Sequence, residues 1–291
     1  MLVTRTQLLR AGCQQMSDFS KVMARARVDV ISCISIWTEL LEQRLSDMIE
    51  YAYCKGSAAK KWDSEIDYVP LLSDVDIHFR VREGSRPFPA GGEGMRAAAD
   101  MACDYETRFR ERNPRSLHLP RTQLMLLNDL EKEPLYVPPS LTELHIMLGE
   151  PPKKTLLADQ RIREIDSSQL RSLRPYLDAM PMSISDRTGL DWWSFVRQMN
   201  WRVSPSPVRL LSQSCDDPLA VWSWNRTRLC SELKEYGLGG IEERYRGYYL
   251  AGWQLFQSRL TGSSNYRLIA SKGYDLLAGC LEELELLESR T

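Results

Sequence analysis

The sequence lacks the features that mark several common classes of protein. Its seven cysteines form no Cys-x-x-Cys pair and are odd in number, which argues against structural zinc and a disulfide framework. Only three histidines are present, so a Ser/His or Cys/His catalytic unit has little support. No apolar run reaches the roughly 18 residues of a membrane span, and the first residues lack the apolar core of a signal peptide. We therefore expect a cytoplasmic protein with free thiols and no membrane partner.

The sequence also lacks an excess of charge of either sign. Its net charge is −1 over 291 residues, so there is no general electrostatic case for binding nucleic acid. A hydrophobic content of 43% and a charged content of 26% are typical of a globular protein. The length is sufficient for two domains.

Apolar periodicity divides the chain into an N-terminal mixed part and a C-terminal helical part. Residues 17–53 read as a long helix with Ser17 as its N-cap, and residues 51–54 could already form a first strand. Its expected apolar face consists of Val30, Ile34, Trp37, Leu41, Leu45 and Met48.

A clean alternation of apolar and polar residues predicts a strand over residues 74–82. A loop is expected over 83–92 and a helix over 93–112. Residues 120–128 read as a second strand, which we expect to pair antiparallel beside the first.

Prolines cluster between residues 132 and 155 and indicate a domain boundary, with a short strand or helix at 141–148. We predict an α+β chain with a mixed-sheet domain over 1–150 and an all-α domain over 151–291. Two apolar stripes at helical spacing are interpreted as core: Trp192, Phe195, Val196 and Met199, and Leu277, Cys280, Leu281 and Leu284.

The most informative residues lie between 54 and 79. Gly56 and Ser57 form a Gly-Ser pair, and Ser73 leads into Asp74-Val75-Asp76 at the start of the predicted strand. Side chains alternate along a strand, so Asp74 and Asp76 share a face, about 7 Å apart. Paired carboxylates suit hard cations such as Mg²⁺, and a Gly-Ser turn can present N–H groups and a hydroxyl to phosphate. Most Asp-x-Asp pairs taken alone, however, are solvated strand ends or turns.

This arrangement resembles the nucleotidyltransferase superfamily, whose signature is Gly-Ser followed by Asp-x-Asp. The resemblance covers roughly residues 30–130 and implies a nucleotidyltransferase-like mixed β-sheet domain followed by a helical domain, as in the antibiotic-type enzymes. It implies transfer of a nucleoside monophosphate from a nucleoside triphosphate, with ATP as the expected donor, to a hydroxyl of a small molecule or a protein. The acceptor in that family normally lies between the two domains.

The same resemblance assigns the site residues. Asp74 and Asp76 are the expected catalytic residues and hold one or two Mg²⁺ ions, with Gln123 in the place of a third carboxylate. Asp129, at the end of the second strand, is the alternative to Gln123. Gly56, Ser57, Ser73 and Lys60 are the expected nucleotide-binding residues, and Lys55 and Lys61 are close enough in sequence to contribute.

Two other interpretations remain open. The spacer between Ser57 and Asp74 is longer than is usual in the family, and Gln123 supplies no charge. Both features favour a catalytically inactive nucleotidyltransferase-fold module that binds a nucleotide or a partner. The third interpretation is a helical interaction protein in which the motif is accidental.

The segment from Arg202 to Arg209, Arg-Val-Ser-Pro-Ser-Pro-Val-Arg, is a second candidate site. Two arginines flank two hydroxyls, which would suit an anion, whereas a rigid turn whose arginines pair with local acids is the structural alternative. Asn225-Arg-Thr-Arg228 is a similar but weaker candidate.

Overall fold

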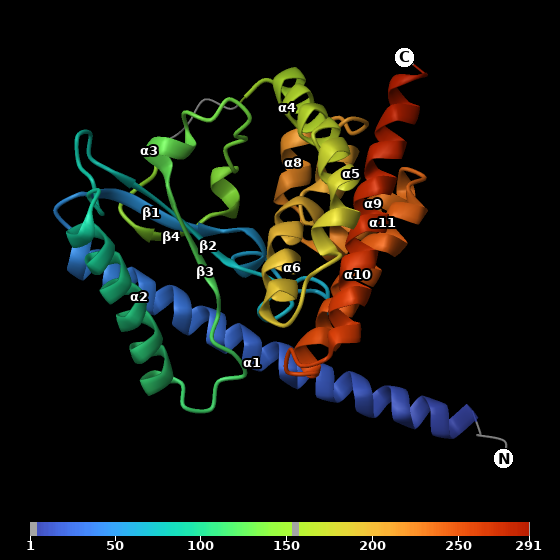
Figure 1. Ribbon diagram of the computed structural model, residues 1–291, viewed down its shortest axis with the longest axis horizontal. Helices are drawn as coiled ribbons and strands as arrows, with labels where there is room; N and C mark the ends of the chain where they lie inside the picture. Colours follow the sequence, from blue (N-terminus) through green and yellow to red (C-terminus); the bar gives the residue numbers. More distant parts are fainter. Residues whose placement is uncertain (1–4, 153–156, 291) are drawn as a thin grey trace. The chain divides into compact units, whose positions relative to one another are not determined.

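The structure is a computed structural model that describes residues 5–152 and 157–290, with side chains described from Phe19 onward. It is an α+β protein in which one mixed four-stranded sheet is accompanied by many helices (Figure 1). The predicted α+β class is thereby confirmed. The chain forms two compact units, a sheet unit and a helical unit.

The sheet unit is made of the described parts of Met1–Ala58, Ser73–Leu127 and His145–Pro151. Its elements are α1 (Arg5–Leu45), β1 (Ile49–Lys55), the 3₁₀ turn η1 (Gly56–Ala58), β2 (Val75–Val81), α2 (Gly92–Arg112), β3 (Thr122–Leu126) and β4 (His145–Leu148). The strand order is β3-β2-β1-β4, so β1 and β2 are the central strands. Helix α1 lies against the sheet and α2 packs beside α1 (Figure 1).

Two expectations for this unit change in detail, and a third concerns residues 141–148, which are divided between the two units. Helix α1 begins at Arg5, so Ser17 lies inside it and is not its N-cap. β3 pairs with β2 in parallel, not antiparallel as expected. The reason is that α2 stands between the two strands in sequence and returns the chain to the same end of the sheet, as in a βαβ crossover. Residues 141–148 contain both predicted alternatives, a 3₁₀ turn, η2 (Leu141–Glu143), and β4.

The predicted apolar faces form the core of the sheet unit. Val75, Ile77, Phe79 and Val81 of β2 are all buried, as are the α1 residues from Val30 to Leu45 that were expected to share one face. Removing these side chains from water supplies the main driving force for packing the helix on the sheet.

The helical unit comprises Ala59–Leu72, Asn128–Leu144 and the described part of Pro152–Thr291. Residues 153–155, at the end of the predicted proline-rich boundary, lie outside the described residues. Its longer helices are α4 (Asp159–Arg171), α5 (Leu173–Ile184), α6 (Leu190–Val203), α9 (Arg226–Glu235), α10 (Gly239–Gln257) and α11 (Ser263–Glu288). Short helices are α3 (Leu127–Leu130), shared with the sheet unit, α7 (Ser206–Leu211) and α8 (Pro218–Ser223).

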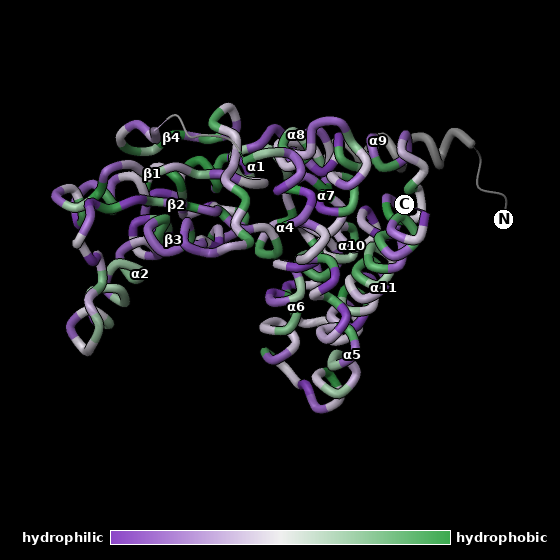
Figure 2. Tube along the Cα trace, turned by 90° about the horizontal axis from the view of Figure 1, so that it is seen from above, coloured by the Kyte–Doolittle hydropathy of each residue, from purple (hydrophilic) through white to green (hydrophobic). Residues whose placement is uncertain are grey.

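Both predicted stripes of the helical unit are buried, on α6 and α11 respectively. Hydrophobic and hydrophilic residues alternate along α5, α10 and α11 in Figure 2, as expected for helices that bury one face. Among the described residues, no helix combines the length and apolar character needed to cross a membrane. The six described cysteines carry free thiols.

A buried carboxylate ties α1 to the loop that precedes β3. Asp29 is 3% exposed, and its Oδ2 accepts hydrogen bonds from the backbone N–H of Leu117 at 2.9 Å and of His118 at 3.0 Å. The same oxygen lies 3.0 Å from Nδ1 of the buried His118 ring. One oxygen therefore satisfies several polar groups that have left water.

We expect Asp29→Ala to lower the free energy of unfolding by about 3 kcal/mol, because it strands buried donors without an acceptor. Urea unfolding followed by circular dichroism measures this change. The matched control is Glu42→Ala at an exposed position of the same helix, which should change stability by less than about 0.5 kcal/mol. A loss below about 1 kcal/mol for Asp29→Ala would show that the loop is held by other contacts.

Candidate functional site

The polar face of β2 brings the predicted motif residues into rows across the sheet. Asp76 is the Cα partner of Lys55 on β1 and of Gln123 on β3. Paired positions on neighbouring strands project to the same face, so an ammonium, a carboxylate and an amide stand side by side. The structure thus places Gln123 next to Asp76. The parallel pairing of β3, which the sequence analysis missed, preserves this neighbourhood.

The Gly-Ser turn lies against Asp76. Gly56 has a φ of +73°, a left-handed conformation that favours glycine. A Cβ built on Gly56 would come 2.6 Å from Oδ2 of Asp76, closer than any real contact allows. On the other side of the turn, Nη1 of Arg27 donates to the carbonyl oxygen of Ala58 at 2.9 Å. The turn is therefore held in place with its backbone directly beside the second carboxylate of the motif.

The first carboxylate of the motif forms an ion pair. Asp74 is 7% exposed and its Oδ1 contacts Nη2 of Arg121, whose side chain is 15% exposed. The backbone supports this pairing, because the carbonyl of Arg121 accepts a hydrogen bond from the N–H of Val75 at 2.9 Å. Ser73, immediately before Asp74, is buried at 1% exposure.

Sequence reasoning missed Arg121, although a signal was present. It stands two residues before Gln123, so in an extended chain the two side chains project to the same face of the sheet. Once β3 is aligned with β2 in parallel, Arg121 falls opposite Asp74 just as Gln123 falls opposite Asp76.

The donor set on this face is small. Among the described residues, no group of three or more His, Cys, Asp or Glu side chains is placed to hold a metal ion. Asp129, the alternative third ligand, is exposed and pairs with Lys132 at 3.0 Å within the helical unit. The oxygen ligands that the motif and its neighbour Gln123 offer are those of Asp74, Asp76 and Gln123, which are of the hard type that Mg²⁺ prefers.

Lys60 lies in the other unit and has other partners there. Its Nζ donates to the carbonyl oxygens of Trp222 at 2.6 Å and Trp224 at 2.9 Å, all within the helical unit. Lys61 pairs with Asp63 on the surface of the same unit. Both lysines are therefore engaged within the helical unit.

Both lysines lie near the start of Ala59–Leu72, the stretch between the Gly-Ser turn and the Asp-x-Asp motif. We call this stretch the spacer segment. Polar contacts hold it within the helical unit. The buried guanidinium of Arg226 donates to the carbonyls of Ile66 at 2.8 Å and Asp67 at 3.0 Å. The carboxylate of Asp67 accepts from the backbone N–H and the hydroxyl of Thr227.

Further contacts hold the end of the spacer segment. Trp253 Nε1 donates to the carbonyl of Glu65 at 2.7 Å, and the Asn200 amide donates to the carbonyl of Leu72 at 3.1 Å. The candidate Asn225–Arg228 motif is thus explained: Asn225 caps α9 and Arg226 anchors the spacer segment.

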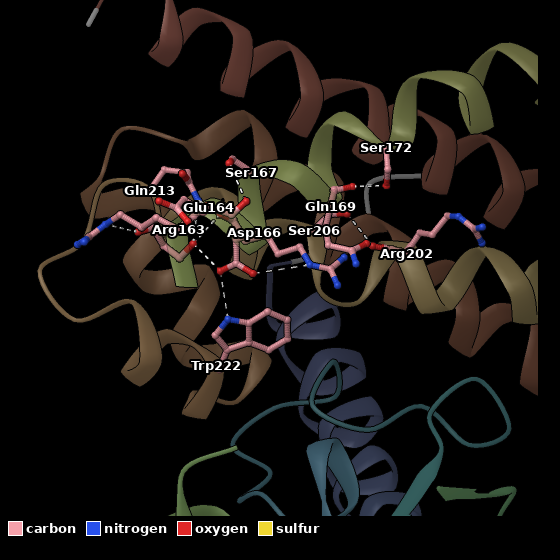
Figure 3. Close-up of polar contacts among 12 residues, drawn as sticks. Arg163, Glu164, Asp166, Ser167, Gln169, Ser172, Arg202, Ser206, Gln213 and Trp222 are labelled. Atoms are coloured by element: carbon pink, nitrogen blue, oxygen red, sulfur yellow. Dashed lines mark hydrogen bonds and ion pairs between the residues drawn. The ribbon is translucent and has the colours of Figure 1, made fainter. Parts of the chain in front are cut away.

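Residues of the second candidate site, Arg202–Arg209, make polar contacts with other residues of the helical unit (Figure 3). Asp166 is fully buried, and its Oδ2 accepts from the Ser212 hydroxyl at 2.7 Å and from Trp222 Nε1 at 3.2 Å. Its Oδ1 lies 3.9 Å from Nε of Arg209. Burial raises the pKa of Asp166 and lowers the pKa of Arg209 to about 10, and each charge moderates the shift of the other.

Arg202, at the other end of that segment, lies over the ring of Tyr176 at 4.1 Å and donates to the carbonyl of Gln198 at 3.2 Å. The segment joins α6 to α7 as a tight helical turn. Pairing with an acid, as the structural alternative expects, is found for Arg209, whereas Arg202 is held by an aromatic ring and a backbone carbonyl.

Comparisons of this chain with protein-family models, with curated proteins and with solved structures found no match. The function of the chain is therefore inferred from the geometry of its own residues.

We expect Gly56→Ala to destabilise the protein more than Gly84→Ala. Both glycines have positive φ, but a Cβ at Gly84 would meet nothing within 4 Å. The control therefore isolates backbone strain, about 1 kcal/mol, from the clash with Asp76. The measurement is the difference between the two free energies of unfolding, which should be about 1 kcal/mol or more. Equal losses would mean that the carboxylate of Asp76 turns aside from the new Cβ at little cost.

Proposed function

We propose that this chain is a metal-dependent nucleotidyltransferase that moves a nucleoside monophosphate from a nucleoside triphosphate to a hydroxyl of a small molecule or a protein. The observation that carries the proposal is the contact between the Gly56 turn and Asp76. It unites the two halves of the motif, which are separated by a long spacer in sequence, on one face of a mixed sheet. The nucleotidyltransferase-like fold is part of the same proposal.

The roles follow from the chemistry of each group. The backbone and hydroxyl of Gly56 and Ser57, with Ser73 next to Asp74 in the chain, would hold the triphosphate. Asp74 and Asp76, with the amide oxygen of Gln123, would hold Mg²⁺, which when bound neutralises charge on the phosphates and the attacking oxygen. Lys55, in one row with Asp76 and Gln123, adds a positive charge on the phosphate side.

The proposed reaction is a single in-line displacement. The acceptor hydroxyl attacks the α-phosphorus and loses its proton to solvent or a base. A new phosphorus–oxygen bond forms while the bond to the β-phosphate breaks, and pyrophosphate leaves. Positioning of the two reactants supplies much of the rate enhancement in such transfers.

A second candidate function is a nucleotide-binding module without transfer activity. Two observations favour it. Gln123 provides an amide where a charge would strengthen metal binding, and Asp74 is engaged by Arg121. Both reduce the negative charge available to cations, and two metal ions need more of it than one.

We expect isothermal titration calorimetry to detect ATP binding that requires Mg²⁺. Asp74→Asn and Asp76→Asn should each weaken it by at least about tenfold, because even outer-shell partners of metal ligands typically contribute 10–100-fold. The matched control is Asp100→Asn at an exposed position of α2 in the same unit, which should bind as the wild type does.

The same titration separates the two functions when it is combined with a transfer assay. ATP labelled at its α-phosphate, incubated with a panel of small hydroxyl compounds and with cell protein, should label an acceptor and release pyrophosphate. Metal-dependent binding without any transfer would support the module. No binding of any nucleoside triphosphate would refute both functions.

A further inference from the structure

The ion pair between Arg121 and Asp74 raises a question that the proposed function leaves open. Asp74 is a predicted metal ligand, yet an arginine side chain already contacts it, with both groups largely removed from water. A buried carboxylate needs a counter-charge, and here the protein itself supplies one. Any cation that binds Asp74 must share it with the guanidinium or displace it.

Each carboxylate of the motif has a cationic neighbour on this face. Asp74 is paired with Arg121, and Asp76 has Lys55 as its cross-strand neighbour. A divalent cation arriving alone would add two positive charges next to a guanidinium, which repels it. A metal arriving with a triphosphate brings its own negative charge, and phosphate oxygens are preferred ligands of arginine.

Resting on the proposed function, we propose that Arg121 is a counter-ion that exchanges partners on ligand binding. Without ligand it neutralises Asp74. When the metal–triphosphate arrives, the guanidinium passes from the carboxylate to a phosphate oxygen, and Asp74 becomes available as a ligand. No covalent bond changes in this step. Arg121 is a positioning residue that makes binding of metal and binding of nucleotide mutually dependent.

The strand pairing makes such an exchange local. The backbone of Arg121 is fixed by its carbonyl, which accepts from the N–H of Val75, so only the side chain has to move. The same fixed backbone carries Gln123 opposite Asp76. One strand therefore presents a movable cation to the first carboxylate and a neutral oxygen ligand to the second.

The test uses the full-length protein and two titrations. Binding of Mn²⁺ alone is followed by electron paramagnetic resonance, and binding of ATP in saturating Mg²⁺ is followed by calorimetry. Arg121→Gln should strengthen binding of Mn²⁺ alone by about tenfold and weaken binding of MgATP by about tenfold, within the usual range of coupling between two ligands. Arg121→Lys keeps the charge but not the planar fork, and should fall between Arg121→Gln and the wild type in both titrations.

Arg86→Gln, an exposed arginine of the same unit, is the matched control and should leave both titrations unchanged. The circular dichroism and unfolding midpoint of each variant establish that it is folded. If Arg121→Gln does not fold, the comparison between Arg121→Lys and wild type carries the test. Opposite shifts in the two titrations support the exchange. Unchanged titrations, or weakening of both, would overturn it and leave Arg121 a structural partner of Asp74.

The two proposals fail in different ways. If no variant binds ATP but Arg121→Gln still gains affinity for Mn²⁺, the nucleotidyltransferase proposal is refuted and the transfer of Arg121 to phosphate with it. If wild type binds MgATP and Arg121→Gln matches it in both titrations, only the partner exchange is refuted.

Discussion

Charges that leave water must be matched inside the protein, and this constraint organises both units. Asp74 is met by Arg121, Asp166 by Arg209 and hydrogen-bond donors, and the guanidinium of Arg226 by backbone carbonyls and the ring of Tyr249, 3.9 Å away. An unmatched buried charge would cost several kcal/mol, a large share of the stability of an ordinary domain. The same requirement that holds the helical unit together therefore also sets the state of the candidate site.

Much of this structure could be predicted from local patterns. The alternation around Asp76 gave the strand and its two faces, and the three- and four-residue spacing of apolar side chains gave the buried stripes of α1, α6 and α11. These succeed because burial of one face follows directly from periodicity. The neighbourhood of Asp76 and Gln123 came from the family resemblance and not from a local pattern, and the strand register places the two residues opposite each other.

What the sequence could not provide was partnership between distant residues. Strand direction depends on the path of the whole connection, so the parallel pairing of β3 was missed. The partner of Asp74 is 47 positions away in the chain, and the spacing of Arg121 from Gln123 identifies it only once β3 is aligned in parallel with β2. Lys60 also illustrates this limit. It is close to Gly56 in sequence, which suggested a phosphate ligand, but its ammonium donates hydrogen bonds to the distant carbonyls of Trp222 and Trp224.

The spacer segment also has a consequence for how the chain is made. The guanidinium of Arg226, which donates to the carbonyl of Ile66, lies 160 positions later in the chain. At typical rates of synthesis the ribosome therefore needs roughly 8 to 32 seconds between making the two partners of this hydrogen bond. During that interval Ile66, Tyr68 and Val69, all fully buried in the finished protein, have no core to enter. The nascent sheet unit must carry this apolar loop between β1 and β2 until the late helices emerge. The order of synthesis thus makes the final contacts of the spacer segment among the last to form.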